Sequence, residues 1–231
     1  MLFRPFVIGL SLSAAVFAAG VASGVPDAAR SLEDRLAKAP GPVANELRSI
    51  AAKALQERYP ELAKKFTTTT AAPSERAPRT TPPPEAAAIQ KRMGQMRGLA
   101  TDEDRARLAI ELSKEIRALP AGSAKLILAQ GICNLSTEGD LGKEALAAVS
   151  GTLAQAMRET PGSASSYLEL ASLVRYEHVP PPPADPALDA ADVLLVLRQA
   201  LAQENDFTLT SLDGKSYTLS ALRGKVVLLN F

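Results

Sequence analysis

The side chains best suited to chemistry are scarce in this sequence, which has one cysteine, Cys133, one histidine, His178, and no tryptophan. A single cysteine cannot form an intramolecular disulfide or a Cys-x-x-Cys redox pair. A single histidine with no cysteine nearby does not make a zinc site of the usual kind. Cys133 lies on the apolar face of an expected helix, where we expect a small buried hydrophobe; the alternative is a redox partner for another domain. We therefore predict no catalytic, cofactor-binding or metal-binding residue, and no cofactor, within residues 1–231.

The remaining polar residues indicate solvated surface. His178 stands at a helix end before Pro180, where a cation is favourable, and we assign it a structural or surface role. Lys91, Arg92 and Arg97 form a small basic cluster, which we interpret as a solvated helix face. The net charge of +1, from 26 basic and 25 acidic residues, gives no electrostatic footprint for nucleic acid.

The N-terminus is typical of a secretory signal peptide. Arg4 supplies the positive charge, an uncharged segment follows, and Ala22 and Gly24 occupy the −3 and −1 positions of a cleavage site. Residues 1–24 are therefore predicted to be a signal peptide. An uncleaved membrane anchor is the alternative, because the uncharged run approaches the ~20 residues that span a bilayer. In either case we expect an exported chain, periplasmic or extracytoplasmic and possibly membrane-anchored.

Two helical regions are predicted on either side of a linker. Residues 25–66 form a helical segment with two helices over 27–66; Ser31 followed by Asp34 resembles a capping pattern, and the first helix stops before Pro40. Residues 67–85 are rich in threonine and proline and cannot bury enough apolar surface to be ordered. A plain spacer is the favoured interpretation, with an O-glycosylated stalk as the alternative.

Residues 86–205 are predicted to form a helical domain. Thr101 and Asp104 make a capping pair, and that helix ends at Pro120. Further helices are expected at about 122–136, 140–159, 163–178 and 186–204, the last with Asp185 as N-cap and Pro186 as first residue. Short breaks between them favour antiparallel hairpins. Equivalent helices recur about 38–41 residues apart, so the domain is either a bundle or an irregular helical repeat.

The pattern changes at Asp206, after which strands are expected. Alternation around Leu209 predicts a strand, Asp213-Gly214 predicts a hairpin turn, and Tyr217 and Leu219 mark the returning strand. Ser220 can cap a single turn containing Leu222. The continuous apolar run 226–231 is typical of a strand covered on both faces.

These elements together resemble the entry of the redoxin superfamily, which includes TlpA/ResA-type thiol–disulfide oxidoreductases and AhpC/TSA peroxidases. The resemblance covers about 26 residues, DFTLTSLDGKSYTLSALRGKVVLLNF, including the Leu212–Lys215 hairpin and Arg223-Gly224-Lys225 before the central strand. It implies that 206–231 open a thioredoxin-like domain. In that family the catalytic cysteines follow the central strand, so they are expected beyond Phe231. The predicted fold is thus mainly α, followed by the first hairpin and central strand of an incomplete α/β thioredoxin fold.

The resulting functional hypothesis is the N-terminal fragment of an exported redoxin-domain protein. Its intact form would be a thiol–disulfide oxidoreductase with a protein thiol or disulfide as partner, whereas the 231-residue chain should be inactive. The first alternative is an exported helical protein-interaction module without redox activity, whose helical region binds a protein partner. The second is a peroxiredoxin-type peroxide reductase. The ending Leu228-Leu229-Asn230-Phe231 favours the reductase subtype.

Overall fold

The computed structural model describes residues 24–67, 83–136, 140–160, 162–204, 208–211 and 213–222. In this part of the chain the fold is mainly helical, with nine α-helices and one two-stranded antiparallel sheet. The α-helices are α1 (Val25–Leu36), α2 (Gly41–Leu55), α3 (Pro60–Phe66), α4 (Pro84–Gln95), α5 (Asp102–Ala118), α6 (Ser123–Ser136), α7 (Gly142–Glu159), α8 (Ala164–Tyr176) and α9 (Pro186–Gln203). The shorter elements are η1 (Met96–Gly98), β1 (Thr208–Thr210), β2 (Ser216–Thr218) and η2 (Leu219–Leu222).

The predicted helix starts at Thr101 and Asp185 are confirmed by their caps. The Thr101 hydroxyl oxygen accepts a hydrogen bond from the backbone N–H of Asp104 at 3.1 Å. The Asp185 carboxylate accepts one from the N–H of Ala187 at 2.8 Å, and Pro186 opens α9. Each side chain satisfies a backbone donor that has no partner within its own helix, which is why these helices begin where the sequence pattern places them.

The start of the first helix is different from the one suggested by Ser31 and Asp34. Helix α1 already begins at Val25, so both residues lie inside it rather than at its cap. Pro26 in the first turn has a φ angle suited to a helix start, and Asp27 places a negative charge near the positive end of the helix dipole. These two signals determine the N-terminus of α1.

Residues 27–66 contain three helices instead of the predicted two. Pro60 lacks a backbone N–H and disfavours helical geometry at the residue before it, and Tyr59 adopts φ −128° and ψ 57°. The second helix therefore stops at Leu55, and Pro60 opens a third. Glu57 and Arg58 fall in the turn between them.

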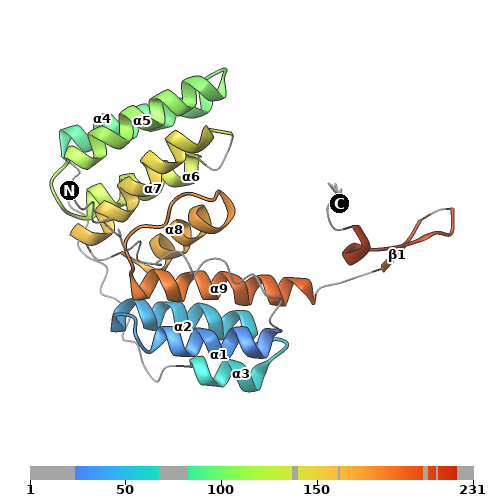
Figure 1. Cartoon of the computed structure of the whole chain (residues 1–231). Helices are drawn as coiled ribbons and strands as arrows, with labels where there is room; N and C mark the ends of the chain where they lie inside the picture. Colours follow the sequence, from blue (N-terminus) through green and yellow to red (C-terminus); the bar gives the residue numbers. More distant parts are fainter. Residues whose placement is uncertain are drawn as a thin grey trace, which may run out of the picture.

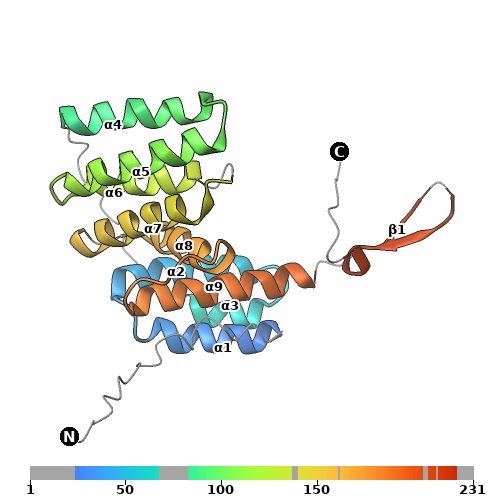
Figure 2. The same ribbon diagram turned by 45° about the horizontal axis from the view of Figure 1, so that its top comes forward.

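The helices α4 to α9 are stacked as successive pairs (Figures 1 and 2). Within the stack α5 lies along α7, and α8 lies along α9. The first helices of the pairs, α4, α6 and α8, begin at residues 84, 123 and 164, in agreement with the predicted spacing of about 40 residues. Small side chains allow close approach: a Cβ on Gly131 of α6 would lie 2.9 Å from the Met93 side chain of α4.

The N-terminal helices close the end of the stack that is farthest from α4. Helix α1 lies along α9, and α2 contacts both α8 and α9. Arg35, near the end of α1, forms an ion pair at 3.6 Å with Asp189, near the start of α9, so the two helices run antiparallel. Leu32 and Leu36 of α1 and Leu194 of α9 are buried in the same hydrophobic core. Residues 25–66 and 86–205, on either side of the predicted linker, thus share one core.

The C-terminal hairpin β1–β2 stands apart from the helices in both views, beyond the end of α9 (Figures 1 and 2). The predicted signal peptide up to residue 23, residues 68–82 of the predicted linker, and the predicted central strand 226–231 lie outside the described residues. Within the residues that the structure describes, we find no helix with the length and apolar character needed to cross a bilayer.

Candidate functional site

The hairpin at 208–218 forms as the sequence predicts. Leu209 pairs with Tyr217 across the two strands, and Thr208 pairs with Thr218. Gly214 adopts φ +79°, a conformation that L side chains rarely adopt, which explains glycine at this position of the turn. The returning strand ends at Thr218, however, so Leu219 belongs to the following 3₁₀ turn and Ser220 lies within that turn rather than before it. Phe207 and Leu212 lie outside the described residues.

Hydrogen bonds within the turn fix its geometry. The backbone N–H of Ser211 donates to the carbonyl of Lys215 at 2.9 Å, and the N–H of Gly214 donates to the carbonyl of Ser211 at 2.9 Å. The Ser211 hydroxyl donates to the Asp213 carboxylate, and the Lys215 ammonium lies 2.9 Å from the same carboxylate. These two partners lower the pKa of Asp213. The turn is therefore held by local contacts and does not depend on the helices.

The two faces of the hairpin differ in character. Since side chains alternate along a strand, the paired residues Leu209 and Tyr217 share one face. Their side chains remain 57% and 46% exposed. The opposite face is polar, and the hydroxyls of Thr208 and Thr218 lie 2.8 Å apart across it. The hairpin thus presents an apolar face on which further polypeptide could pack.

Cys133 is buried in the helical core, as predicted. Its side chain is inaccessible to solvent, and Sγ lies 3.9 Å from the carbonyl oxygen of Val149 on α7. Burial raises the pKa of the thiol well above its ordinary value, and the charge of Glu169 on α8 raises it further. The thiolate is the reactive form of cysteine, so this environment holds Cys133 in its unreactive form.

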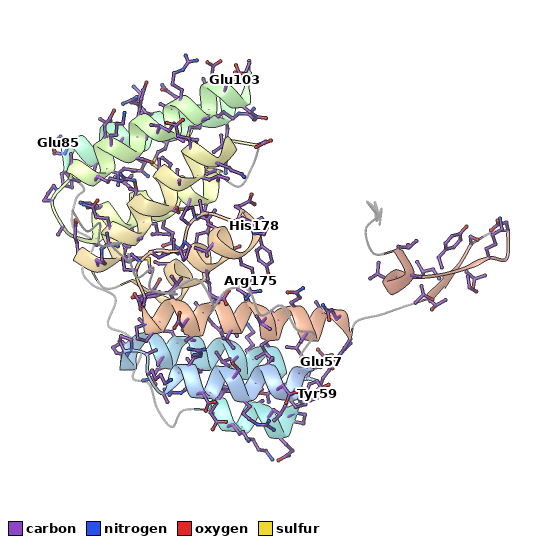
Figure 3. The ribbon with its side chains drawn as sticks, viewed as in Figure 1. Glu57, Tyr59, Glu85, Glu103, Arg175 and His178 are labelled. Atoms are coloured by element: carbon purple, nitrogen blue, oxygen red, sulfur yellow. The ribbon has the colours of Figure 1, made fainter. Side chains whose placement is uncertain are left out.

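The other residues singled out in the sequence do not converge on one site. His178 follows the end of α8, is exposed, and has a positive φ of 54° (Figure 3). Arg92 was expected on a solvated face but is half-buried, with its guanidinium bound to Glu111 at 3.0 Å and to Glu115. Hydrogen bonding to Glu115 raises the pKa of Arg92. Lys91 is exposed on the same helix, and Arg97 lies in η1.

A buried lysine, not anticipated from the sequence, holds the end of α5. The Lys125 side chain is 3% exposed, and its Nζ donates to the carbonyls of Arg117 at 2.7 Å and Leu119 at 3.0 Å. The third contact is an ion pair with Glu159 at 2.7 Å. An ammonium has three donors, and all three are used here. Because the partners are the last carbonyls of α5, the charge also favours the negative end of that helix dipole.

A second buried pair joins α8 to α9. The Arg175 guanidinium donates two hydrogen bonds of 2.7 Å to the two carboxylate oxygens of Asp192. The Asp192 side chain is 6% exposed, so the pair is largely removed from water. This bidentate geometry fixes the relative orientation of the two helices. A charged residue at a core position of a helix, such as Asp192 between Ala191 and Val193, is the sequence signal that identifies such a pair.

The connector between α8 and α9, residues 177–185, covers a small cavity beside α7. The cavity has a volume of about 110 Å³ and is lined by small side chains of α7, by Leu170 of α8 and by Pro180 and Pro182 of the connector. In the part of the chain that the structure describes, no group of three or more histidine, cysteine, aspartate or glutamate side chains is placed to hold a metal ion. The charged clusters described above, around Arg92, Lys125 and Arg175, are ion pairs between helices.

No protein-family model, no curated protein and no solved structure matches this chain significantly.

Proposed function

We propose that this chain is the N-terminal part of an exported redoxin-domain protein. In this proposal the helical body, α1–α9, is an accessory region, and residues 206–231 begin the redoxin-type domain. The intact protein would then be a thiol–disulfide oxidoreductase. The reacting thiolate would attack a disulfide sulfur of a partner protein, form a mixed disulfide, and be released when a second cysteine attacks that bond. Both cysteines are expected beyond Phe231.

The observation that carries this proposal is the order of elements after α9. A short strand, a turn at Asp213-Gly214, a second strand and a 3₁₀ turn at 219–222 follow one another in the order that the redoxin resemblance requires. The exposed pair Leu209 and Tyr217 gives this hairpin an apolar face suited to packing in a larger domain. The burial of Cys133 supports placing the chemistry outside the helical body.

The reading frame after the codon for Phe231 tests this proposal directly. We expect a continuing frame that encodes a tryptophan and a Cys-x-x-Cys pair. The extended protein should reduce insulin disulfides, and changing both cysteines to serine should abolish that activity. A stop codon directly after Phe231 would contradict the proposal. A Thr-x-x-Cys peroxidatic loop in place of Cys-x-x-Cys would replace the reductase by the peroxiredoxin-type alternative.

A helical protein-interaction module without redox activity is the second candidate. It is favoured by the stacking of helix pairs from α4 to α9, because stacks of this kind offer extended surfaces for partners. The same extended protein separates the two candidates. Insulin reduction by that protein would favour the redoxin candidate, whereas a stop codon directly after Phe231 would favour the interaction module.

A further inference from the structure

Helices α1–α3 meet the stack α4–α9 through an apolar interface. Helix α1 lies along α9, and α2 contacts both α8 and α9. Helix α1 buries one complete side in the core that it shares with α9: Val25, Ala28, Ala29, Leu32 and Leu36. A helix of 12 residues is marginal in water on its own, so packing on the stack supplies most of the stability of α1.

Polar contacts at three places fix the position of α1–α3 on the stack. Arg35 of α1 forms its ion pair of 3.6 Å with Asp189 near the start of α9. Glu46 of α2 accepts a backbone N–H at the start of α8. The hydroxyl of Tyr59, just before α3, donates at 2.8 Å to the carboxylate of Glu204, just after α9 (Tyr59 is labelled in Figure 3). These contacts lie at both ends of α9 and at the start of α8, and they define one docking geometry for α1–α3.

The α3–α4 segment, residues 67–83, has to connect opposite ends of the stack (Figures 1 and 2). Helix α2 contacts α8, α8 contacts α6, and α6 contacts α4. At 8–10 Å between the axes of packed helices, these three steps amount to about 24–30 Å. The 18 residue steps from Phe66 to Pro84 reach at most about 60–65 Å. A flexible chain of that length has a typical end-to-end distance of roughly 21–25 Å, so closure within one chain is possible but is not favoured by proximity.

We infer that α1–α3 are an exchangeable unit: the face of α8 and α9 that they cover also accepts α1–α3 of a second copy of this chain. The structure itself defines this occupant, because the face already holds the same three helices. An exchanged dimer preserves every contact described above, and it is reciprocal, so it closes with twofold symmetry. The inference does not depend on the redox proposal, since none of these contacts lies beyond Glu204.

The length of the α3–α4 segment decides between the two forms and gives the first test. Deleting 69–82 from the 231-residue chain leaves four residue steps between Phe66 and Pro84. Their reach of about 13–14 Å is too short for closure within one chain, so this variant should be a folded dimer by size-exclusion chromatography with light scattering. A variant with a glycine–serine segment of equal length in place of 69–82 is the control. It should be a monomer with the helical circular dichroism and Tm of the wild type.

The ion pair between Arg35 and Asp189 tests whether the contact crosses between copies. In the shortened chain Arg35→Asp and Asp189→Arg are made separately, so an exchanged homodimer of either variant has like charges at both positions. A heterodimer of the two variants restores opposite charges at both positions. After the variants are refolded together, native mass spectrometry should therefore find the heterodimer well above the fraction of about one half that random pairing gives.

The wild-type chain should show the same exchange at high concentration. It should be a monomer after refolding at about 1 µM and contain dimer after refolding at about 1 mM, because tethers of this length give effective concentrations in the millimolar range. The inference is overturned if the shortened variant is a folded monomer, if it is a monomer whose α1–α3 are readily digested by protease, or if the charge-reversed variants pair at random.

Discussion

The carboxylate of Glu46, in α2, accepts a hydrogen bond of 2.8 Å from the backbone N–H of Ala164, the first residue of α8. These residues are separated by 118 positions in the chain. The contact satisfies one of the four N–H groups that a helix leaves unpaired at its start, and it places a negative charge at the positive end of the helix dipole. An N-terminal helix therefore caps a helix of the stack.

Glu46→Ala should destabilise the fold by about 1 kcal/mol, because the α8 terminus loses a charged acceptor that water only partly replaces. The measurement is the free energy of unfolding from urea denaturation followed by circular dichroism. Glu33→Ala, at an exposed position of α1, is the matched control and should change stability far less. Equal effects of the two changes would mean that the cap contributes nothing specific.

Lys125→Met should cost about 2–4 kcal/mol, because it leaves the carbonyls of Arg117 and Leu119 without their donor in a buried site. Lys143→Met, at an exposed position near the start of α7, is the control for the change in side-chain chemistry. Both are compared by urea denaturation at neutral pH. A loss for Lys125→Met no larger than for the control would show that the terminus of α5 is adequately satisfied by water.

Acidification should weaken the same contact. Hydrogen bonds from Lys125 and then from Gln155 lower the pKa of Glu159 below its ordinary value. A carboxyl whose folded-state pKa is depressed contributes its stability above the unfolded-state pKa of about 4.3 and loses it as the pH falls through the folded-state value. The difference in stability between the wild type and Glu159→Gln should therefore be largest near pH 7 and shrink towards pH 3. A difference independent of pH in urea denaturation would contradict this linkage.

The Cys133 thiol should be almost unreactive in the folded protein. We expect modification by an aromatic disulfide reagent, followed by absorbance, to be at least about a hundredfold slower in buffer than in denaturant, since the thiol is buried and its pKa is raised. For the same reason the 231-residue chain should show neither insulin reductase nor peroxidase activity. Turnover in either assay that Cys133→Ser abolishes would refute this prediction.

Cutting the chain between α3 and α4 should leave the two pieces bound to each other. A protease recognition sequence is placed within residues 68–82, and the cleaved protein is analysed by size-exclusion chromatography. The pieces should co-elute because α1 and α2 are packed against α8 and α9. Leu32→Asp introduces a charge at a fully buried position of α1 and should release the N-terminal piece. Separation of the unmodified pieces would show that their interface is too weak to persist alone.

Local signals in the sequence account for most of the helix boundaries. Thr101, Asp185 and Pro186 mark helix starts through backbone groups only a few residues away, so their effect is visible in the sequence itself. The turn at Asp213-Gly214 is local in the same way. The additional helix boundary before α3 also has a local signal, because Pro60 ends the preceding helix and opens the next.

The pairing of distant groups could not be predicted in this way. The partners of Lys125 and Asp192 are fixed by the packing of helices, and charged residues are assigned to the surface in the absence of that information. The contact of α1 with α9 has no counterpart in any local pattern. The connector between α8 and α9 is intermediate: its prolines restrict the backbone, but only the fold determines that Val179 is buried.

The antiparallel contact of α1 with α9 has a consequence for the time course of synthesis. Helix α1 ends at Leu36 and α9 begins at Pro186, so about 150 residues are added between them, which takes roughly 8–30 s at ordinary rates of translation. During that interval the apolar side of α1, with Leu32 and Leu36, lacks its native partner. The first helix of the described residues is thus among the last to be buried, and the completion of α9 is the event that allows the nascent chain to close.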